Sequence, residues 1–221
     1  MSQAGQWPPP AAPHYEATKR ALDVTIATLG LALGSPVWII LAAAIRLSSS
    51  GPALFRRQVA GRQGQAFTYF KFRTMRQGDD SHHREWLKEF VRNDAPYSTE
   101  PGRPAFKVVA DPRVTPVGRL LRRLSLDEVP QLINVLRGEM SVVGPRPPIL
   151  AEFEHYDEQA RRRLAVKPGI TGLYQVTARS AVPFSRMVEI DCDYIERRSL
   201  RLDLWIMART FGAVLGGSGA A

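Results

Sequence analysis

Cysteine is almost absent from this chain of 221 residues, because Cys192 is the only one. A single cysteine excludes an internal disulfide framework and any metal site built from several cysteines, which agrees with a reducing compartment. His82 and His83 have no second cluster of ligands at metal-binding spacing, so we expect them on the solvated surface. Residues 1–13 lack the basic start, apolar centre and cleavage site of a secretory signal.

Acidic residues are also in short supply: 21 Asp and Glu stand against 30 Lys and Arg, which gives a net charge of +9. Such a basic chain favours polyanions, phosphorylated small molecules or an anionic membrane surface as partners. No nucleic acid is expected, because the sequence has neither basic stripes interleaved with stacking aromatic residues nor a nucleic-acid-binding signature.

The longest uncharged stretch covers the 22 residues 24–45 and is rich in Leu, Ile, Ala and Val. A helix of this length can cross a bilayer core of about 30 Å. Ser35 and Pro36 stand near its midpoint, where the proline removes a backbone donor and favours a kink or break. The Ser35 hydroxyl can bond a carbonyl that the proline leaves free, which eases the cost of an interrupted helix in lipid.

Positive charges flank this stretch on both sides, with Lys19 and Arg20 before it and Arg46, Arg56 and Arg57 after it. The positive-inside rule therefore sends neither end outward. We expect a helix-break-helix hairpin that enters one leaflet and returns, because each limb is too short to span. A kinked but complete crossing is the alternative.

A β-hairpin is predicted directly after the apolar stretch. Two runs with strand character, 54–59 and 67–75, are separated by a glycine-bearing turn. Lys71 and Arg73 would share one face of the second strand, where they could meet a phosphate or simply be solvated. The polar segment 77–102 is interpreted as a variable peripheral segment.

Two adjacent carboxylates, Asp127 and Glu128, follow a basic, leucine-rich segment and precede a new apolar helix. The basic segment is expected to be a helix with Thr115 as N-cap and Pro116 at its first position. Its mixture of arginine and leucine suits an anionic membrane surface. Ser125 and Glu128 have the spacing of a capping box, and the local sequence alone favours this structural role over a catalytic one.

Two proline-bound loops follow. In residues 144–148 prolines fix the backbone around Arg146, so this arginine loses less entropy when it grips a phosphate or stacks on a base. Residues 167–172 predict a tight turn with proline second and glycine third. Helices are expected around 184–197 and at 202–215.

Together these motifs resemble the bacterial polyprenyl-phosphate sugar-phosphate transferases of the monotopic phosphoglycosyl transferase type. The matching stretches occur in the family's order between about Lys19 and Leu215. They are 19–23, 35–36, 71–75, 111–116, 125–130, 134–147, 168–172 and 189–191. The chain shows no long N-terminal membrane domain and is therefore similar to the small members of the family.

The resemblance implies an enzyme that moves a sugar 1-phosphate from a UDP-sugar to polyprenyl (undecaprenyl) phosphate and releases UMP. By this likeness Asp127 is the nucleophile, which forms a covalent phosphosugar-aspartyl intermediate, and Glu128 helps to hold Mg²⁺. The family's essential lysine, arginine and distal carboxylate fall on Lys71, Arg122 and Asp191. A metal and nearby cations are also what the chemistry needs, because a carboxylate that attacks a diphosphate must overcome repulsion between anions.

Further binding residues follow from the same likeness. Arg146 with Pro147 matches the nucleotide-contacting arginine, and Arg73 joins the predicted substrate-binding set. Where the family has an asparagine-glycine-arginine run, this chain has Thr177, Ala178 and Arg179, so Arg179 alone is carried over. The pair Ser35 and Pro36 matches the break of the family's membrane hairpin, and Asp127 stands with Glu128 as a candidate metal ligand.

We therefore expect a predominantly helical α+β fold with amphipathic interfacial helices and a small β-hairpin. It would comprise a disordered tail (1–16), a re-entrant membrane hairpin (17–50), one catalytic domain (51–215) and a flexible tail (216–221). The resemblance places it on the cytoplasmic face of the bacterial inner membrane, where it would initiate exopolysaccharide, capsule, O-antigen or glycoprotein glycan assembly. The identity of the sugar and the formation of a homodimer stay open.

Two other functions are weighed against the transferase. A non-catalytic basic module that binds the membrane surface would need neither Asp127, nor Lys71, nor an arginine held between prolines. A nucleic-acid binder is disfavoured, because the uncharged stretch 24–45 would be exposed in a soluble protein.

Overall fold

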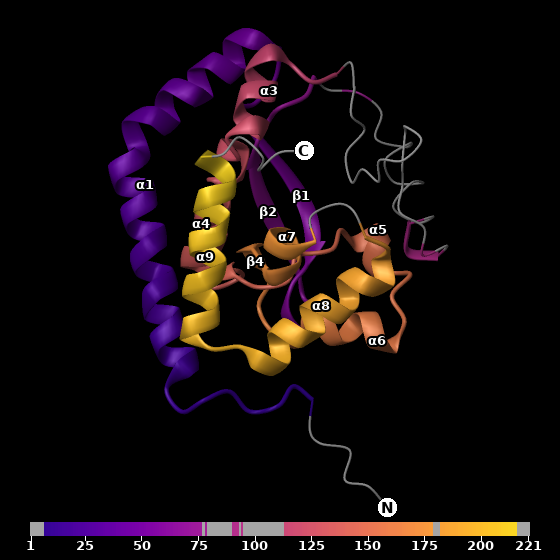
Figure 1. The fold of residues 1–221 in the computed structure, drawn as a ribbon. Helices are drawn as coiled ribbons and strands as arrows, with labels where there is room; N and C mark the ends of the chain where they lie inside the picture. Colours follow the sequence, from indigo (N-terminus) through magenta and orange to yellow (C-terminus); the bar gives the residue numbers. More distant parts are fainter. Residues whose placement is uncertain are drawn as a thin grey trace, which may run out of the picture.

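The computed structural model describes residues 7–76, 78, 90–92, 94, 113–178 and 182–215. Helices predominate and two small sheets complete the fold (Figure 1), which confirms a mostly helical α+β protein. The α-helices are α1 (Tyr15–Ser48), α3 (Pro116–Arg123), α4 (Gln131–Arg137), α5 (Leu150–Phe153), α6 (Glu158–Arg161), α7 (Leu173–Thr177), α8 (Phe184–Arg197) and α9 (Leu200–Leu215). The strands are β1 (Leu54–Ala60), β2 (Ala66–Phe72), β3 (Ser141–Val143) and β4 (Gly169–Thr171).

Helix α1 is continuous, where we expected two limbs separated by a non-helical break at Ser35 and Pro36. Figure 1 shows that α1 bends in its C-terminal half, the half that contains Pro36. The Ser35 hydroxyl donates to the carbonyl of Ala32 at 2.8 Å, and this carbonyl lies four residues before the proline, which has no N–H. The side-chain bond replaces the missing backbone bond, so the helix bends without opening.

Within the described residues, α1 is the one helix long and apolar enough to cross a membrane. Large apolar side chains are exposed on α1, on α3 with its C-cap residue, and on α9. These side chains are Leu29, Leu33, Val37, Ile39, Ile40, Leu47, Leu120, Leu124, Leu204, Trp205 and Phe211. So many exposed apolar groups favour contact with lipid, which supports membrane association.

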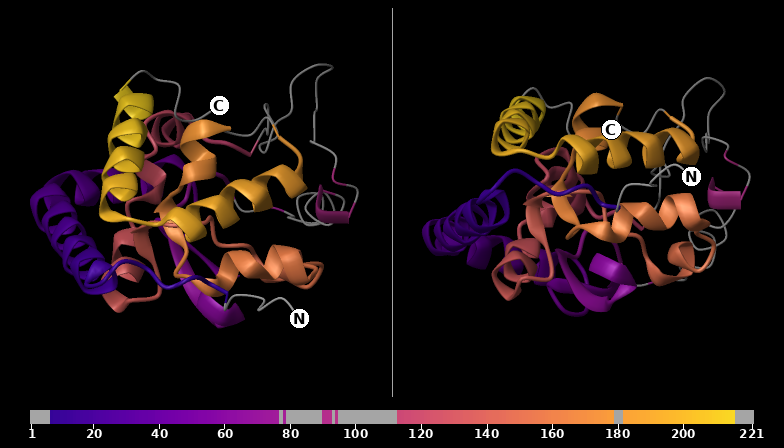
Figure 2. Two further views of the ribbon diagram at one scale, coloured as in Figure 1. Left: turned by 60° about the horizontal axis from the view of Figure 1, so that its bottom comes forward. Right: turned by 90° about the horizontal axis from the view of Figure 1, so that it is seen from below.

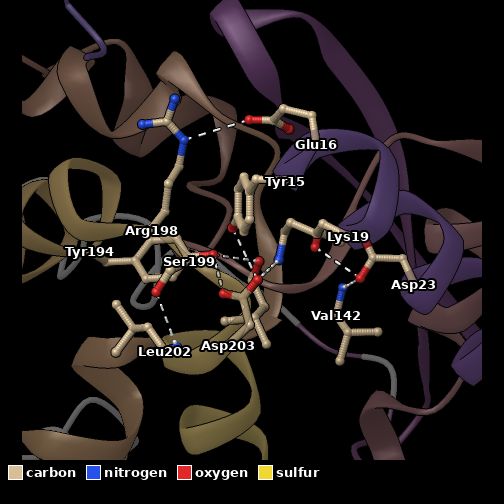
Figure 3. Close-up of polar contacts among 12 residues, drawn as sticks. Tyr15, Glu16, Lys19, Asp23, Val142, Tyr194, Arg198, Ser199, Leu202 and Asp203 are labelled. Atoms are coloured by element: carbon tan, nitrogen blue, oxygen red, sulfur yellow. Dashed lines mark hydrogen bonds and ion pairs between the residues drawn. The ribbon is translucent and has the colours of Figure 1, made fainter. Parts of the chain in front are cut away.

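The first turns of α1 are fixed to other helices by a buried carboxylate, Asp203 of α9 (Figure 3). It accepts hydrogen bonds from the Tyr15 hydroxyl at 3.0 Å and from the Lys19 ammonium at 2.7 Å. The Tyr194 hydroxyl of α8 donates to the other oxygen at 2.8 Å. Asp23 ties the next turn of α1 to β3, because it accepts a backbone N–H of that strand at 2.9 Å.

The segment before α1 differs from the expected disordered tail, since residues 7–14 dock on the protein. The indole N–H of Trp7 donates to the carbonyl of Arg162 at 3.2 Å, and the Arg162 guanidinium lies 5.2 Å from the indole ring centroid. Arg198 donates to the carbonyl of Pro9 at 2.8 Å. Side-chain contacts hold this proline-rich segment although it has few backbone donors. Our predictions for residues 1–6, 216–221 and most of 77–102 lie outside the described residues.

The strands form two pairs. β1 and β2 make the predicted antiparallel hairpin, whereas β3 and β4 form a parallel pair that we did not predict. The predicted tight turn at 167–172 is wrong, because Gly169 opens β4. A Cβ atom on Gly169 would lie 2.1 Å from the backbone nitrogen of Gly144. The glycine therefore allows two backbones to approach closely and is not part of a turn.

The largest buried cluster lies between the β1–β2 hairpin, α4 and α8. It includes Val59, Phe67, Val135 and Val188. In both views of Figure 2, α1 lies at one edge of the molecule. The hairpin and α4, which carry or adjoin the predicted site residues, are therefore positioned by the core, while α1 remains open to lipid.

Candidate active site

Asp127 lies on a one-turn 3-10 helix, Leu126–Glu128, between α3 and α4, and is 3% exposed. The Lys71 ammonium from β2 lies 2.6 Å from Asp127 Oδ2 and 3.9 Å from Glu128 Oε1. The structure thus brings together the lysine and both carboxylates that the sequence predicted. Lys71 therefore compensates the charge of this buried carboxylate directly.

The capping box predicted at Ser125 and Glu128 does not form. Ser125 has a φ of 53°, its side chain makes no cap hydrogen bond, and α4 begins only at Gln131. A helix that started at Leu126 would place Pro130 beyond its first turn, where proline breaks the backbone ladder. The carboxylates therefore lie on a separate short turn and do not start an α-helix.

Two arginines of the predicted site make intramolecular contacts. Arg122, in the last turn of α3, donates from Nε to the Thr74 hydroxyl at 3.0 Å. Arg73 is buried and donates to the backbone carbonyls of Ser49, at 2.7 Å, and of Ser50. It therefore satisfies carbonyls at the C-terminal end of α1. This role could not be predicted from local sequence, because the partner carbonyls come from another element.

Tyr69 and Gln131 are polar neighbours that sequence reasoning missed. Tyr69 precedes Lys71 by two residues on β2 and so points to the same side of the strand. Its hydroxyl accepts a hydrogen bond from Gln131 Nε2 at 2.6 Å. Burial raises the pKa of Tyr69 well above its ordinary value; Glu128 raises it further, while the positive charge of Arg146 lowers it. Glu128 and Arg146 therefore both act on this tyrosine.

Arg146 lies in the loop between β3 and α5. Its side chain is half-buried, whereas Pro145 and Pro147 on either side are buried. The predicted distal carboxylate, Asp191, is also buried, and it accepts a hydrogen bond from Arg163 Nε at 2.8 Å. Burial raises the pKa of Asp191, and the charge of Arg163 opposes that shift. Asp191 thus faces an arginine that the sequence analysis did not single out.

The carboxylates fit the Mg²⁺ prediction without completing a site. Mg²⁺ in phosphate-transfer sites takes one or two carboxylates and fills its remaining positions with substrate phosphates and water. Glu128, whose side chain is 33% exposed, stands next to the buried Asp127. The described residues contain no group of three or more metal-ligating side chains. Arg179, another predicted contact, lies outside the described residues.

A buried, lysine-paired carboxylate together with helices that expose large apolar side chains is typical of a membrane-associated enzyme. Residues 14–217 match the family model for bacterial sugar transferases, and the chain belongs to this family. It is 43% identical over 196 residues to the exopolysaccharide production protein ExoY of Rhizobium meliloti, which covers 89% of this chain and 84% of that protein. It is 42% identical over 205 residues to the UDP-glucose:undecaprenyl-phosphate glucose-1-phosphate transferase of Caulobacter vibrioides, with 89% and 69% covered.

A third relative is longer, and the match covers less than half of it. The undecaprenyl-phosphate galactose phosphotransferase of Salmonella typhimurium is 40% identical over 202 residues, which cover 91% of this chain and 41% of that protein. The family model and these relatives confirm the family resemblance that the motifs indicated.

Proposed function

We propose that this protein transfers a sugar 1-phosphate from a UDP-sugar to undecaprenyl phosphate and releases UMP, which initiates assembly of a bacterial glycan. The 2.6 Å contact between the Lys71 ammonium and the buried Asp127 carboxylate carries the proposal. The names of the Caulobacter and Salmonella relatives describe sugar-phosphate transfer to the same lipid acceptor.

The reaction proceeds in two displacements. A carboxylate oxygen of Asp127 attacks the phosphorus atom that carries the sugar, the bond to the bridging oxygen breaks, and UMP leaves. A phosphate oxygen of the lipid acceptor then attacks the same phosphorus atom, which releases the Asp127 carboxylate and forms a diphosphate-linked sugar. Lys71, Arg122 and Arg146 supply positive charge around these anions.

Mg²⁺ would be held by Glu128 together with Asp127. When bound, it neutralises charge on the donor diphosphate. A titration tests this role: Glu128→Gln should need more Mg²⁺ for half-maximal rate, and an unchanged titration would contradict it.

The length, exposed apolar surface and bend of α1 support the proposed membrane arrangement. The helix would enter one leaflet, bend in the half that contains Pro36, and return to the cytoplasmic face. The exposed apolar residues of α3 and α9 would lie in the interface. This arrangement lets a water-soluble donor meet an acceptor that stays in lipid.

The decisive experiment compares Asp127→Asn with Asp193→Asn, an exposed carboxylate of α8. With UDP-sugars and undecaprenyl phosphate in detergent, Asp127→Asn should abolish UMP release while Asp193→Asn retains it. Wild-type protein given donor without acceptor should gain the mass of one phosphosugar on Asp127. Near-normal turnover of Asp127→Asn would refute the nucleophile. Binding of anionic vesicles without UMP release by the wild type would support the non-catalytic membrane module.

A further inference from the structure

The loop 144–148 is anchored largely through its carbonyl groups, because three of its five residues are prolines and lack a backbone N–H. The carbonyl of Pro145 accepts the backbone N–H of Gly169 at 2.9 Å. The carbonyl of Pro148 accepts the backbone N–H of Ala60 at 2.9 Å. These bonds tie the two ends of the loop to β4 and β1.

The carbonyl in the middle of the loop is bound by a side chain. Arg163 Nη2 donates to the carbonyl of Arg146 at 3.4 Å. The other two nitrogens of Arg163 also donate: Nε to Asp191 at 2.8 Å, and Nη1 to the Tyr156 hydroxyl at 2.6 Å. A planar guanidinium held on two sides presents its third contact in a fixed direction.

The groups around Arg163 are themselves held in place. Arg163 and Asp191 are 2% and 1% exposed. Tyr156 donates its own proton to Glu152 Oε1 at 2.5 Å, and Glu152 is 2% exposed. Buried ion pairs contribute little net stability compared with well-packed apolar residues. Such a network is better explained by the geometry it imposes on the loop.

We propose that Arg163, held by Asp191, is a positioning residue that fixes the backbone of Arg146 and thereby directs its guanidinium toward the uridine nucleotide. Asp191 then supports the reaction through Arg163 and not through contact with substrate. The inference rests on the proposed function, in which Arg146 binds the nucleotide.

The test measures UMP affinity by calorimetry together with KM and kcat for the UDP-sugar. Arg163→Lys keeps a positive charge beside Asp191, but its single nitrogen cannot reach all three partners. It should weaken UMP binding roughly tenfold, the size expected if a misdirected Arg146 loses one hydrogen bond to the nucleotide. KM for the UDP-sugar should rise more than kcat falls. Arg162→Lys is the matched control, because Arg162 is the exposed neighbour and should bind UMP like the wild type.

A second background separates positioning from a general structural role. In Arg146→Ala protein, Arg163→Lys should cause no further loss of UMP affinity, because the effect needs the Arg146 side chain. Equal losses in both backgrounds, or unchanged affinity in Arg163→Lys alone, would overturn the proposal. If Arg163→Lys does not fold, Asp191→Asn provides the test in its place. This variant should also weaken UMP binding. Failure of the wild type to bind UMP would refute the proposed function itself, and the inference with it.

Discussion

The ammonium of Lys71 and the carboxylate of Asp127 meet at 2.6 Å, with side chains 22% and 4% exposed. Loss of the lysine would leave a buried negative charge uncompensated. Lys71→Met should therefore lower sugar-phosphate transfer about 100-fold or more, the size of effect seen when one charge-stabilising donor is removed. UMP release measures the effect, and Arg62→Met, an exposed position in the hairpin turn, is the control. A rate within a few-fold of wild type would show that this pair is not part of the chemistry.

Gly118 in α3 packs against the end of β2. A Cβ atom at this position would lie 2.0 Å from the carbonyl oxygen of Thr74, whose hydroxyl accepts a hydrogen bond from Arg122. Gly118→Ala should push α3 away, lower the melting temperature by several degrees and reduce activity. Gly212→Ala is the matched control in α9, because nothing lies within 4 Å of its Cβ and alanine is the better helix former. Equal melting temperatures for the two variants would contradict the prediction.

The sequence predicted elements whose signals are local. Thr115 caps α3 as expected, since its hydroxyl accepts the N–H of Gly118 at 2.9 Å. Helix α8 occupies the predicted range 184–197. Lys71 was placed with the carboxylates by family resemblance, whereas Arg73, predicted on the same strand face, lies beyond the end of β2 and binds carbonyls after α1. Each of these predictions depends on residues a few positions apart or on a recognised motif.

The missed features depend on contacts between distant segments. Arg163 had no motif of its own, and its importance arises from Asp191 and from a carbonyl of the proline loop. The capping-box prediction, by contrast, failed for a local reason, because Pro130 delays the start of α4. The close approach of Gly144 and Gly169 is an interaction between two strands that short-range turn rules cannot predict.

The bend of α1 should control the membrane topology. Pro36→Ala restores a backbone donor to the carbonyl of Ala32, which now accepts the Ser35 hydroxyl. A straight helix of 34 residues would be about 50 Å long, more than enough to cross the bilayer core. The C-terminal end of α1 should then reach the outer side in Pro36→Ala, whereas both ends stay inside with proline present.

Single cysteines at Ala12 and Ser50 would measure this topology with an impermeant maleimide on intact cells. Burial raises the pKa of Cys192 to about 11, so its thiol should react slowly and give little background at neutral pH. Labelling of only one of the two sites in the protein that retains Pro36 would mean a complete crossing and would reject the hairpin.

Loss of the Asp203 charge should destabilise the protein, because three donors from α1 and α8 converge on this buried carboxylate and would lose their partner. Asp203→Asn removes the ion pair with Lys19 and should cost about 3 kcal/mol, as when one partner of a buried pair is lost. Thermal unfolding in detergent measures the change. Asp193→Asn should cost less than about 0.5 kcal/mol, because its pair with Arg197 is exposed. A similar melting temperature for both variants would count against the convergence of α1, α8 and α9 on Asp203.

Five tyrosines should make the protein sensitive to alkaline pH. Burial raises the pKa of Tyr15, Tyr69, Tyr156, Tyr174 and Tyr194, and the charge of Asp203 adds to the shift at Tyr15 and Tyr194. Above about pH 10 the unfolded chain loses these protons while the folded protein keeps them, so the free energy of unfolding falls as pH rises. Each tyrosine contributes about 1.4 kcal/mol per pH unit in that window and no pH dependence below it. Melting temperatures and phenolate absorbance should therefore change together, and ionisation of more than one of the six tyrosines in folded protein would contradict this expectation.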